Sequence, residues 1–181
     1  MEYSVAVMEL ESIAKGVQAA DDALKAAGVR LVAAQPVCPG KFELIITGEL
    51  AEVNAALERV RAAYADNLLD SVQLGRIDRD VVKALLGTRP AAPKGAVGVI
   101  ETLSIASAVL AADTAVKAAN VSILELRAAQ GIGGKGVVVL TGKVADVTAA
   151  VEAGSRYAKE KSVFVGDSVI PAPHEELWNY L

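Results

Sequence analysis

The sequence contains one cysteine, one histidine and few aromatic residues, and each scarcity excludes a class of protein. Cys38 alone cannot form a disulfide framework within one chain. With aromatic residues at only 4%, the chain lacks the stacking platforms on which proteins bind single-stranded nucleic acid. It has neither an apolar run of about 18 residues nor the basic and apolar segments of an export signal, so we expect a cytoplasmic protein.

The sequence also lacks a large excess of charge of either sign. The 22 acidic residues only slightly outnumber the 18 basic ones, the net charge is −4, and no basic run occurs. The sequence therefore offers no electrostatic reason to expect nucleic acid or an anionic membrane as a partner. What is abundant is apolar: 53% of the 181 residues are hydrophobic, which excludes disorder and suffices for the core of one large domain or two small ones.

The chain repeats itself once. The matched segments are 7–14 (VMELESIA) with 99–106 (VIETLSIA), 19–29 with 111–121, Gly40-Lys41 with Gly134-Lys135, Thr47-Gly48 with Thr141-Gly142, and Asp70-Ser71-Val72 with Asp167-Ser168-Val169. Because the matches include polar residues and a Thr-Gly pair outside the alanine-rich segments, similar composition does not explain them. The spacing exceeds the period of about 20–50 residues of solenoid repeats, so the pattern indicates a duplicated domain. Two prolines and a glycine near the middle predict a linker at 88–94 between a first domain, 1–87, and a second, 95–181.

Each copy is predicted to have the order β-α-β-β-α-β. In the first copy the expected elements are strands 4–9, 31–37, 42–47 and 72–77 and helices 12–27 and 50–64; in the second they are strands 97–101, 121–128, 137–141 and 163–170 and helices 104–119 and 144–158. Gly28 and Asn120, at equivalent places, are expected as left-handed C-caps of the first helix of each copy. The fold class is α/β (α+β), with two tandem ferredoxin-like units.

Enzyme signatures are scarce. A Cys38–His174 pair is conceivable, but a histidine that caps a turn explains His174 more simply. The glycine-rich loop 131–136 lies between two strands, without the following helix that phosphate-binding loops use. We therefore expect no enzyme activity.

Cys38 is the sharpest single signal. It lies in the strand-to-strand turn Val37-Cys38-Pro39-Gly40-Lys41, where exposure is expected. An exposed cysteine in a reducing cytosol is a liability unless it binds something or reacts. One thiolate cannot hold a metal cluster, but rotational symmetry of a homo-oligomer multiplies it, and three chains around one axis would present three.

Several motifs together resemble a known family, the bacterial microcompartment shell proteins with two tandem domains. They are Asp-x-Ala-x-Lys-Ala-Ala-(Gly/Asn)-Val in both copies, Gly-Ile-Gly-Gly-Lys at 131–135 and Val-Ile-Pro-x-Pro-His at 169–174. The resemblance covers essentially the whole chain. Within the family the sequence is most similar to the PduT type, whose first domain carries a Cys-Pro-Gly-Lys-Phe pore loop, found here at 38–42.

The resemblance implies a homotrimer that mimics a hexamer and tiles edge to edge with other shell proteins. It implies that Cys38 from each of three chains binds one [4Fe-4S] cluster at the central opening, for electron transfer across the shell or for cluster delivery, with an encapsulated or cytosolic redox enzyme as a possible partner. The residues assigned to the pore lining are Pro39, Gly40, Lys41, Gly131, Ile132, Gly133, Gly134 and Lys135, and those assigned to tile edges are Lys25, Lys117 and His174. Ala172 departs from the family, which commonly has Arg between the two prolines.

Two alternatives remain open at this point. The tile could lack the cluster and conduct small metabolites through a central pore, with Cys38 free. The chain could also be a soluble enzyme or ligand sensor on a duplicated ferredoxin-like scaffold, because fold does not imply function.

Overall fold

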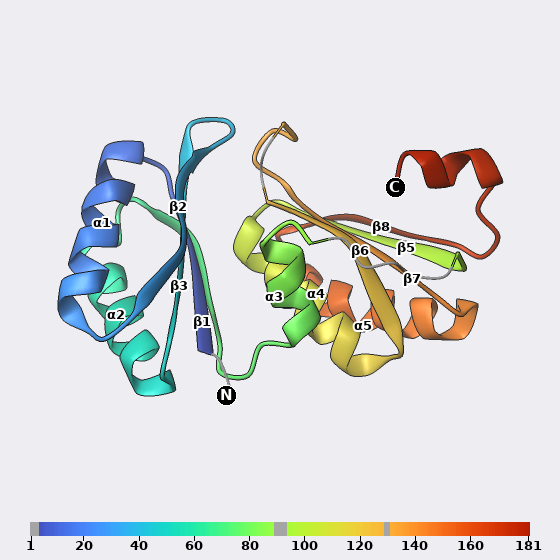
Figure 1. Cartoon of the computed structure of the whole chain (residues 1–181). Helices are drawn as coiled ribbons and strands as arrows, with labels where there is room; N and C mark the ends of the chain where they lie inside the picture. The colour runs from blue at the N-terminus through green and yellow to red at the C-terminus, as the bar shows by residue number, and fades with distance from the viewer. Residues whose placement is uncertain (1–3, 89–93, 129–130) are drawn as a thin grey trace. The chain divides into compact units, whose positions relative to one another are not determined.

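The computed structural model describes residues 4–88, 94–128 and 131–181, and within them each repeat forms its own sheet with helices on one face (Figure 1). The chain divides into two compact units. The first comprises residues 1–77 together with 129–134, and the second comprises residues 78–128 and 135–181.

The first unit is a four-stranded antiparallel sheet in the order β2-β3-β1-β4. Its elements are β1 (Ser4–Leu10), α1 (Ile13–Ala26), β2 (Arg30–Val37), β3 (Lys41–Gly48), α2 (Leu50–Ala63) and β4 (Leu68–Leu74). This confirms the predicted element order, although β4 begins four residues before the predicted 72 and ends three before the predicted 77.

The second unit repeats this architecture with the strand order β6-β7-β5-β8. Its elements are α3 (Arg79–Leu85), β5 (Ala96–Thr102), α4 (Ile105–Ala118), β6 (Val121–Ala128), β7 (Gly136–Gly142), α5 (Val144–Glu160), β8 (Phe164–Ile170) and the short 3-10 helix η1 (Glu175–Asn179). The α/β fold with two such sheets is confirmed. Helices α3 and η1 are additions that the sequence pattern did not predict.

The core of the first unit lies between large side chains on the sheet and small ones on the helices. The sheet contributes Ala6, Met8 and Leu10 from β1 and Phe42, Leu44 and Ile46 from β3. Helix α1 buries only Gly16, Ala19, Ala20 and Ala23. Because these residues are small, the helix lies close against the sheet, and burial of the sheet's large side chains supplies most of the apolar stabilisation.

The strand pairing confirms the duplication in detail and corrects one alignment. Both sheets carry the same two irregularities, for example between Leu31 and Ala33 in β2 and between Ile123 and Glu125 in β6. The predicted match of Asp70 with Asp167 is wrong by one residue, because Asp70 pairs with Glu9 whereas Asp167 pairs with Ile100. Since side chains alternate between faces of a strand, Asp70 and Asp167 lie on opposite faces of their sheets, and Ser71 is the equivalent of Asp167.

The predicted left-handed caps at Gly28 and Asn120 are also wrong. Helices α1 and α4 end in the extended residues Ala27 and Ala119, and neither Gly28 nor Asn120 has a positive φ. The Gly28 N–H instead donates to the Glu52 carboxylate of α2 at 2.6 Å.

Left-handed caps do occur at the ends of two other helices. After α3, Gly87 has φ +75°, its N–H donates to the Ala84 carbonyl, and the Thr88 N–H donates to the Lys83 carbonyl. After α5, Ser162 has φ +58° within the same pair of hydrogen bonds. Both are Schellman motifs.

Residues 89–93 of the predicted linker lie outside the described residues. Helix α3, which the sequence analysis assigned to the first domain, packs against β6 and α4 in the second compact unit.

Candidate functional site

The turn that joins β2 to β3 (Figure 1) contains Cys38, whose side chain is exposed, as predicted, and forms no disulfide. The turn is closed by a hydrogen bond from the Gly40 N–H to the Val37 carbonyl at 2.9 Å. Gly40 has φ +107°, which only glycine adopts without strain. A Cβ built on Gly40 would meet nothing within 4 Å, so this glycine serves backbone conformation and not close packing.

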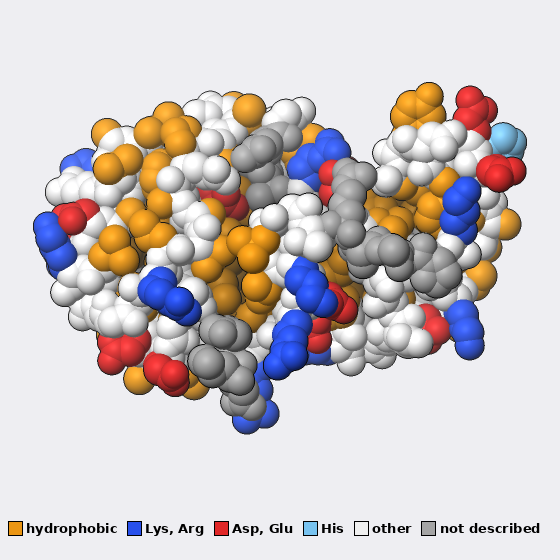
Figure 2. All heavy atoms as spheres, in the orientation of Figure 1, with side chains coloured by type: hydrophobic (Ala, Val, Ile, Leu, Met, Phe, Trp, Pro, Cys, Tyr) orange, Lys and Arg blue, Asp and Glu red, His pale blue; other side chains and the backbone are white. Residues whose placement is uncertain are grey.

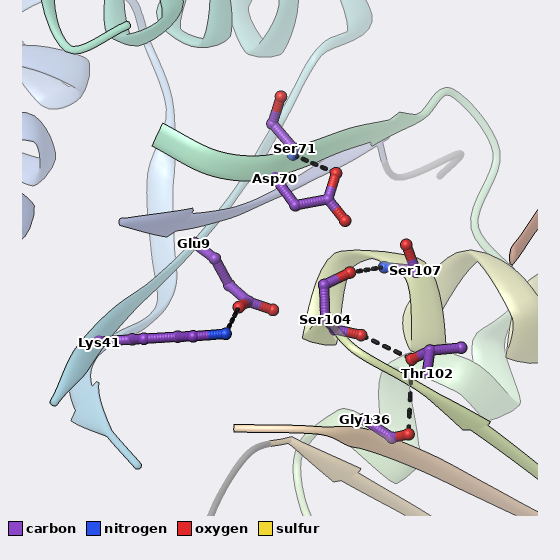
Figure 3. Close-up of polar contacts among 8 residues, drawn as sticks. All are labelled: Glu9, Lys41, Asp70, Ser71, Thr102, Ser104, Ser107 and Gly136. Carbon is purple, nitrogen blue, oxygen red and sulfur yellow. Dashed lines mark hydrogen bonds and ion pairs between the residues drawn. The ribbon is translucent and has the colours of Figure 1, made fainter. Parts of the chain in front are cut away.

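Lys41, at the end of this turn, is held by a buried carboxylate. Its ammonium lies 3.1 Å from Oε2 of Glu9 on the central strand β1, and the Glu9 side chain has no exposed surface (Figure 3). The second copy has the same pair, Lys135 with Glu101 at 2.7 Å, in a more exposed setting. The positive charge of each loop lysine is therefore offset by a carboxylate at its own sheet.

The non-helical face of the first sheet carries a row of polar residues across all four strands. Strand pairing places Gln35, Glu43, Glu9 and Asp70 side by side in that order. Gln35 donates to Glu43 at 2.9 Å. Burial raises the pKa of the Glu43 carboxyl, the Gln35 hydrogen bond opposes this, and the Glu9 charge adds to it. The second sheet has Val137 where the first has Glu43, so the row belongs to the cysteine-containing repeat.

The glycine-rich loop of the second copy is described from residue 131 onward. Gly131, Gly133 and Gly134 all have positive φ, between 67° and 83°, a backbone conformation that glycine adopts without strain. Gly134 belongs to the first compact unit, where a Cβ built on it would lie 2.8 Å from Pro39 Cδ and 3.0 Å from the Cys38 carbonyl oxygen. Gly134 thus lies directly against the Cys38 turn.

The residues assigned to tile edges lie on other elements. Lys25 and Lys117 stand in the last turns of α1 and α4 and pair with Asp21 and Asp113, four residues earlier. The hydrogen bond and charge of Asp21 raise the pKa of Lys25. His174 caps η1, because its Nδ1 accepts the Glu176 N–H at 3.3 Å.

Among the residues that the structure describes, no group of three or more His, Cys, Asp or Glu side chains lies close enough to hold a metal ion. No helix in the same part of the chain is long and apolar enough to span a bilayer. On the face drawn in Figure 2, acidic and basic side chains are interspersed, in agreement with the charge balance of the sequence.

Comparison with known proteins identifies the repeat. A family model described as the BMC domain matches residues 4–77 and again residues 96–173. The bacterial microcompartment shell protein PduT of Citrobacter freundii is 41% identical over 181 residues, which span 100% of this chain and 98% of that protein. The chain belongs to the BMC-domain family of microcompartment shell proteins.

Solved structures of BMC-domain proteins agree with this assignment. A microcompartments protein from Desulfitobacterium hafniense aligns with a TM-score of 0.88 at 42% identity and covers 99% of both chains. A fused permuted hexameric shell protein from the RMM microcompartment aligns with a TM-score of 0.64 at 26% identity, over 86% of this chain and 81% of that one. The predicted tandem BMC architecture is confirmed.

Sequence reasoning missed three features of this BMC-domain protein. The buried Glu9 and Glu43 were not singled out, because their burial depends on strand pairing and not on local pattern. Arg76 was also missed: strand β4 is equivalent to β8 at an offset of 96 (170 − 74), so Arg76 stands where the second copy has Ala172. The first repeat therefore supplies the arginine that the second repeat lacks.

Proposed function

We propose that this protein is a homotrimeric tile of a bacterial microcompartment shell in the cytoplasm, and that one Cys38 from each of three chains binds a single [4Fe-4S] cluster at the central opening. The relatives' names support the shell role, since PduT and the RMM protein are called shell proteins. The observation that carries the cluster proposal is the exposed, free Cys38 in a turn that joins two strands.

The donor set fits an iron–sulfur cluster. Thiolates are the usual ligands of such clusters, and three leave one iron open to a further ligand. A cluster of this kind supplies one-electron transfer when bound. Because the chain has one cysteine, the three thiolates must come from three copies, which a three-fold axis provides.

The surroundings of Cys38 suit this role. The Gly40 Cβ position is open, with no atom within 4 Å, and the Cys38 side chain is exposed. Glu9 holds the Lys41 ammonium toward the sheet. In the proposed trimer, Pro39, Gly40 and Lys41 and the loop 131–135 line the opening, Lys25, Lys117 and His174 lie at tile edges, and other shell proteins and a redox enzyme are the partners.

A second candidate keeps the tile and assigns the opening to small metabolites, with Cys38 free. The paired lysines favour it, because Lys41–Glu9 and Lys135–Glu101 are neutral pairs that place little net charge on either loop. Neither reading requires catalytic groups, and the named relatives are shell proteins.

The test is iron and acid-labile sulfide per chain, with an EPR spectrum, on anaerobically purified wild type beside Cys38→Ser. We expect about four irons per three chains in wild type and almost none in the variant. Light scattering should give three times 18.6 kDa for both proteins. A trimer without iron, even after reconstitution, would overturn the cluster and leave the metabolite pore; a monomer would overturn the tile.

A further inference from the structure

Helices α3 and η1 are equivalent parts of the two repeats. Strand β4 matches β8 at an offset of 96, and at the same offset the first residue of α3, Arg79, matches the first residue of η1, Glu175. Their caps match as well: Asp78 accepts the Asp80 N–H at 2.8 Å, and His174 accepts the Glu176 N–H at 3.3 Å. The duplication has therefore kept this segment in both places.

Helix α3 has buried side chains, whereas η1 has none. Within the second unit α3 lies beside β6 and α4 (Figure 1), and it buries Val81 and Ala84. The Asp78 N–H at its start donates to Oδ1 of Asp113 in α4 at 2.8 Å. By contrast, η1 buries none of its residues, and Tyr180 beside it is 80% exposed.

The surfaces that correspond to the α3 contacts are uncovered in the first repeat. Ile123 of β6 is 1% exposed, while its equivalent in β2, Leu31, is 42% exposed. The Asp113 side chain is 5% exposed, while that of its equivalent in α1, Asp21, is 56% exposed.

The exposed surface continues along α1. Ile13, Val17 and Leu24 form one exposed stripe with Asp21, since they recur at helical spacing. The α4 equivalents of Ile13 and Val17, Ile105 and Val109, are fully buried. The first repeat thus exposes an apolar face whose counterpart in the second repeat is covered.

We infer that the segment 171–181 of one copy docks on the α1/β2 face of a second copy, in the way that α3 docks on β6 and α4 within the chain. The α1/β2 face is defined by Asp21 and Leu31, whose equivalents Asp113 and Ile123 lie beside α3, and by the exposed Ile13, Val17 and Leu24, which continue it along α1. The inference rests on the proposed homo-oligomer and names the surfaces that form it.

The chemistry of the two surfaces matches. At the offset of 96, Leu177 stands for Val81 and Tyr180 for Ala84, so larger apolar side chains face the uncovered Leu31. The His174 N–H stands where the Asp78 N–H is, and the carboxylate of Asp21 is its acceptor on the partner. Each copy offers one such segment and one such face, and a head-to-tail contact of this kind closes into a ring of three when successive copies are related by a third of a turn.

The experiment uses cysteine pairs in the full-length Cys38→Ser protein. Leu31→Cys with Leu177→Cys should give, on mild oxidation, covalent multimers of up to three chains on a non-reducing gel. The matched pair in the second repeat, Val81→Cys with Ile123→Cys, should cross-link within one chain and leave the mass of a monomer. Each single cysteine variant should give no ladder of multimers.

Charge substitutions provide an independent readout. Leu31→Asp and Leu177→Asp should each reduce the mass by light scattering from three chains to one, whereas Leu69→Asp, on an exposed residue of β4, should not. Circular dichroism of the variants checks that the chain is folded. A folded Leu31→Asp protein that keeps the wild-type mass, or no multimers from the first cysteine pair, would overturn the docking. The mass and iron content of the wild-type protein test the proposed trimer and its cluster separately. The cysteine pairs are made in the Cys38→Ser protein, so the presence or absence of a cluster does not affect the cross-linking result.

Discussion

Phe42 fills the space that a side chain at Gly16 would need: a Cβ built on Gly16 would lie 2.2 Å from the Phe42 ring. The second repeat reverses the pair. There Ala108 stands for Gly16 and Gly136 for Phe42, and a Cβ built on Gly136 would lie 2.4 Å from that of Ala108. Helix and sheet therefore lie close together at this point in both repeats. The larger side chain comes from the sheet in the first repeat and from the helix in the second.

This packing predicts that Gly16→Ala destabilises the protein although alanine favours helix. The methyl group would displace the ring at a cost that exceeds the helix gain of about 1 kcal/mol, leaving a net loss of about 2 kcal/mol. Urea unfolding at fixed protein concentration measures the change. The double variant Gly16→Ala, Phe42→Gly copies the second repeat and should relieve the clash, at the expense of the ring's buried area. If Gly16→Ala is as stable as wild type, the ring moves freely and the packing argument is wrong.

The Lys41–Glu9 pair predicts unequal effects of two equivalent substitutions. Glu9 has no exposed surface, so Lys41→Met removes the counter-charge from a buried carboxylate and should cost about 3 kcal/mol. Lys135→Met removes the partner of the more exposed Glu101 and should cost less than about 1 kcal/mol. Unfolding of both variants side by side checks this; equal losses would show that burial does not decide the strength of the pair.

Glu43 predicts a pH dependence. Its folded-state pKa is raised by burial, so the folded protein binds the proton more tightly than the unfolded chain does. Stability is then lost as pH rises from the ordinary value of 4.5 through the raised pKa, and the charged carboxylate lowers stability at pH 7. Glu43→Gln should therefore be more stable than wild type at pH 7, with the difference shrinking as pH falls toward 4.5.

The control for this pH dependence is Glu58→Gln, on an exposed residue of α2, which should change stability by less than about 0.5 kcal/mol at either pH. Thermal unfolding of the three proteins at several pH values is the measurement. A Glu43→Gln protein less stable than wild type at pH 7 would mean that the Gln35 hydrogen bond outweighs desolvation.

The element order could be predicted from the sequence because the repeat supplied two independent copies of each periodic pattern. The exposed Cys38 could be predicted from its turn. Helix α3 could not, since seven residues do not form a stable helix alone and this one depends on packing against β6 and α4. The Glu9–Lys41 pair joins residues 32 positions apart and follows only from strand register. The alignment of Asp70 with Asp167 was wrong for the same reason. The identical residues Asp-Ser-Val favoured that alignment, whereas the strand pairing shows that β4 and β8 are equivalent with a shift of one residue.

The helix ends give the last prediction. Ser162 has φ +58° in the Schellman motif after α5, where a side chain is strained and glycine is not, so Ser162→Gly should stabilise the protein by up to about 1 kcal/mol. Gly87 has the equivalent position after α3, so Gly87→Ala should destabilise the protein by a similar amount.

Gly28 has no positive φ, and its built Cβ meets nothing closer than 3.5 Å, so Gly28→Ala should be neutral or slightly stabilising. Denaturant midpoints of the three variants rank these effects; a loss of about 1 kcal/mol for Gly28→Ala would restore the left-handed cap that the sequence suggested and contradict the extended ending of α1.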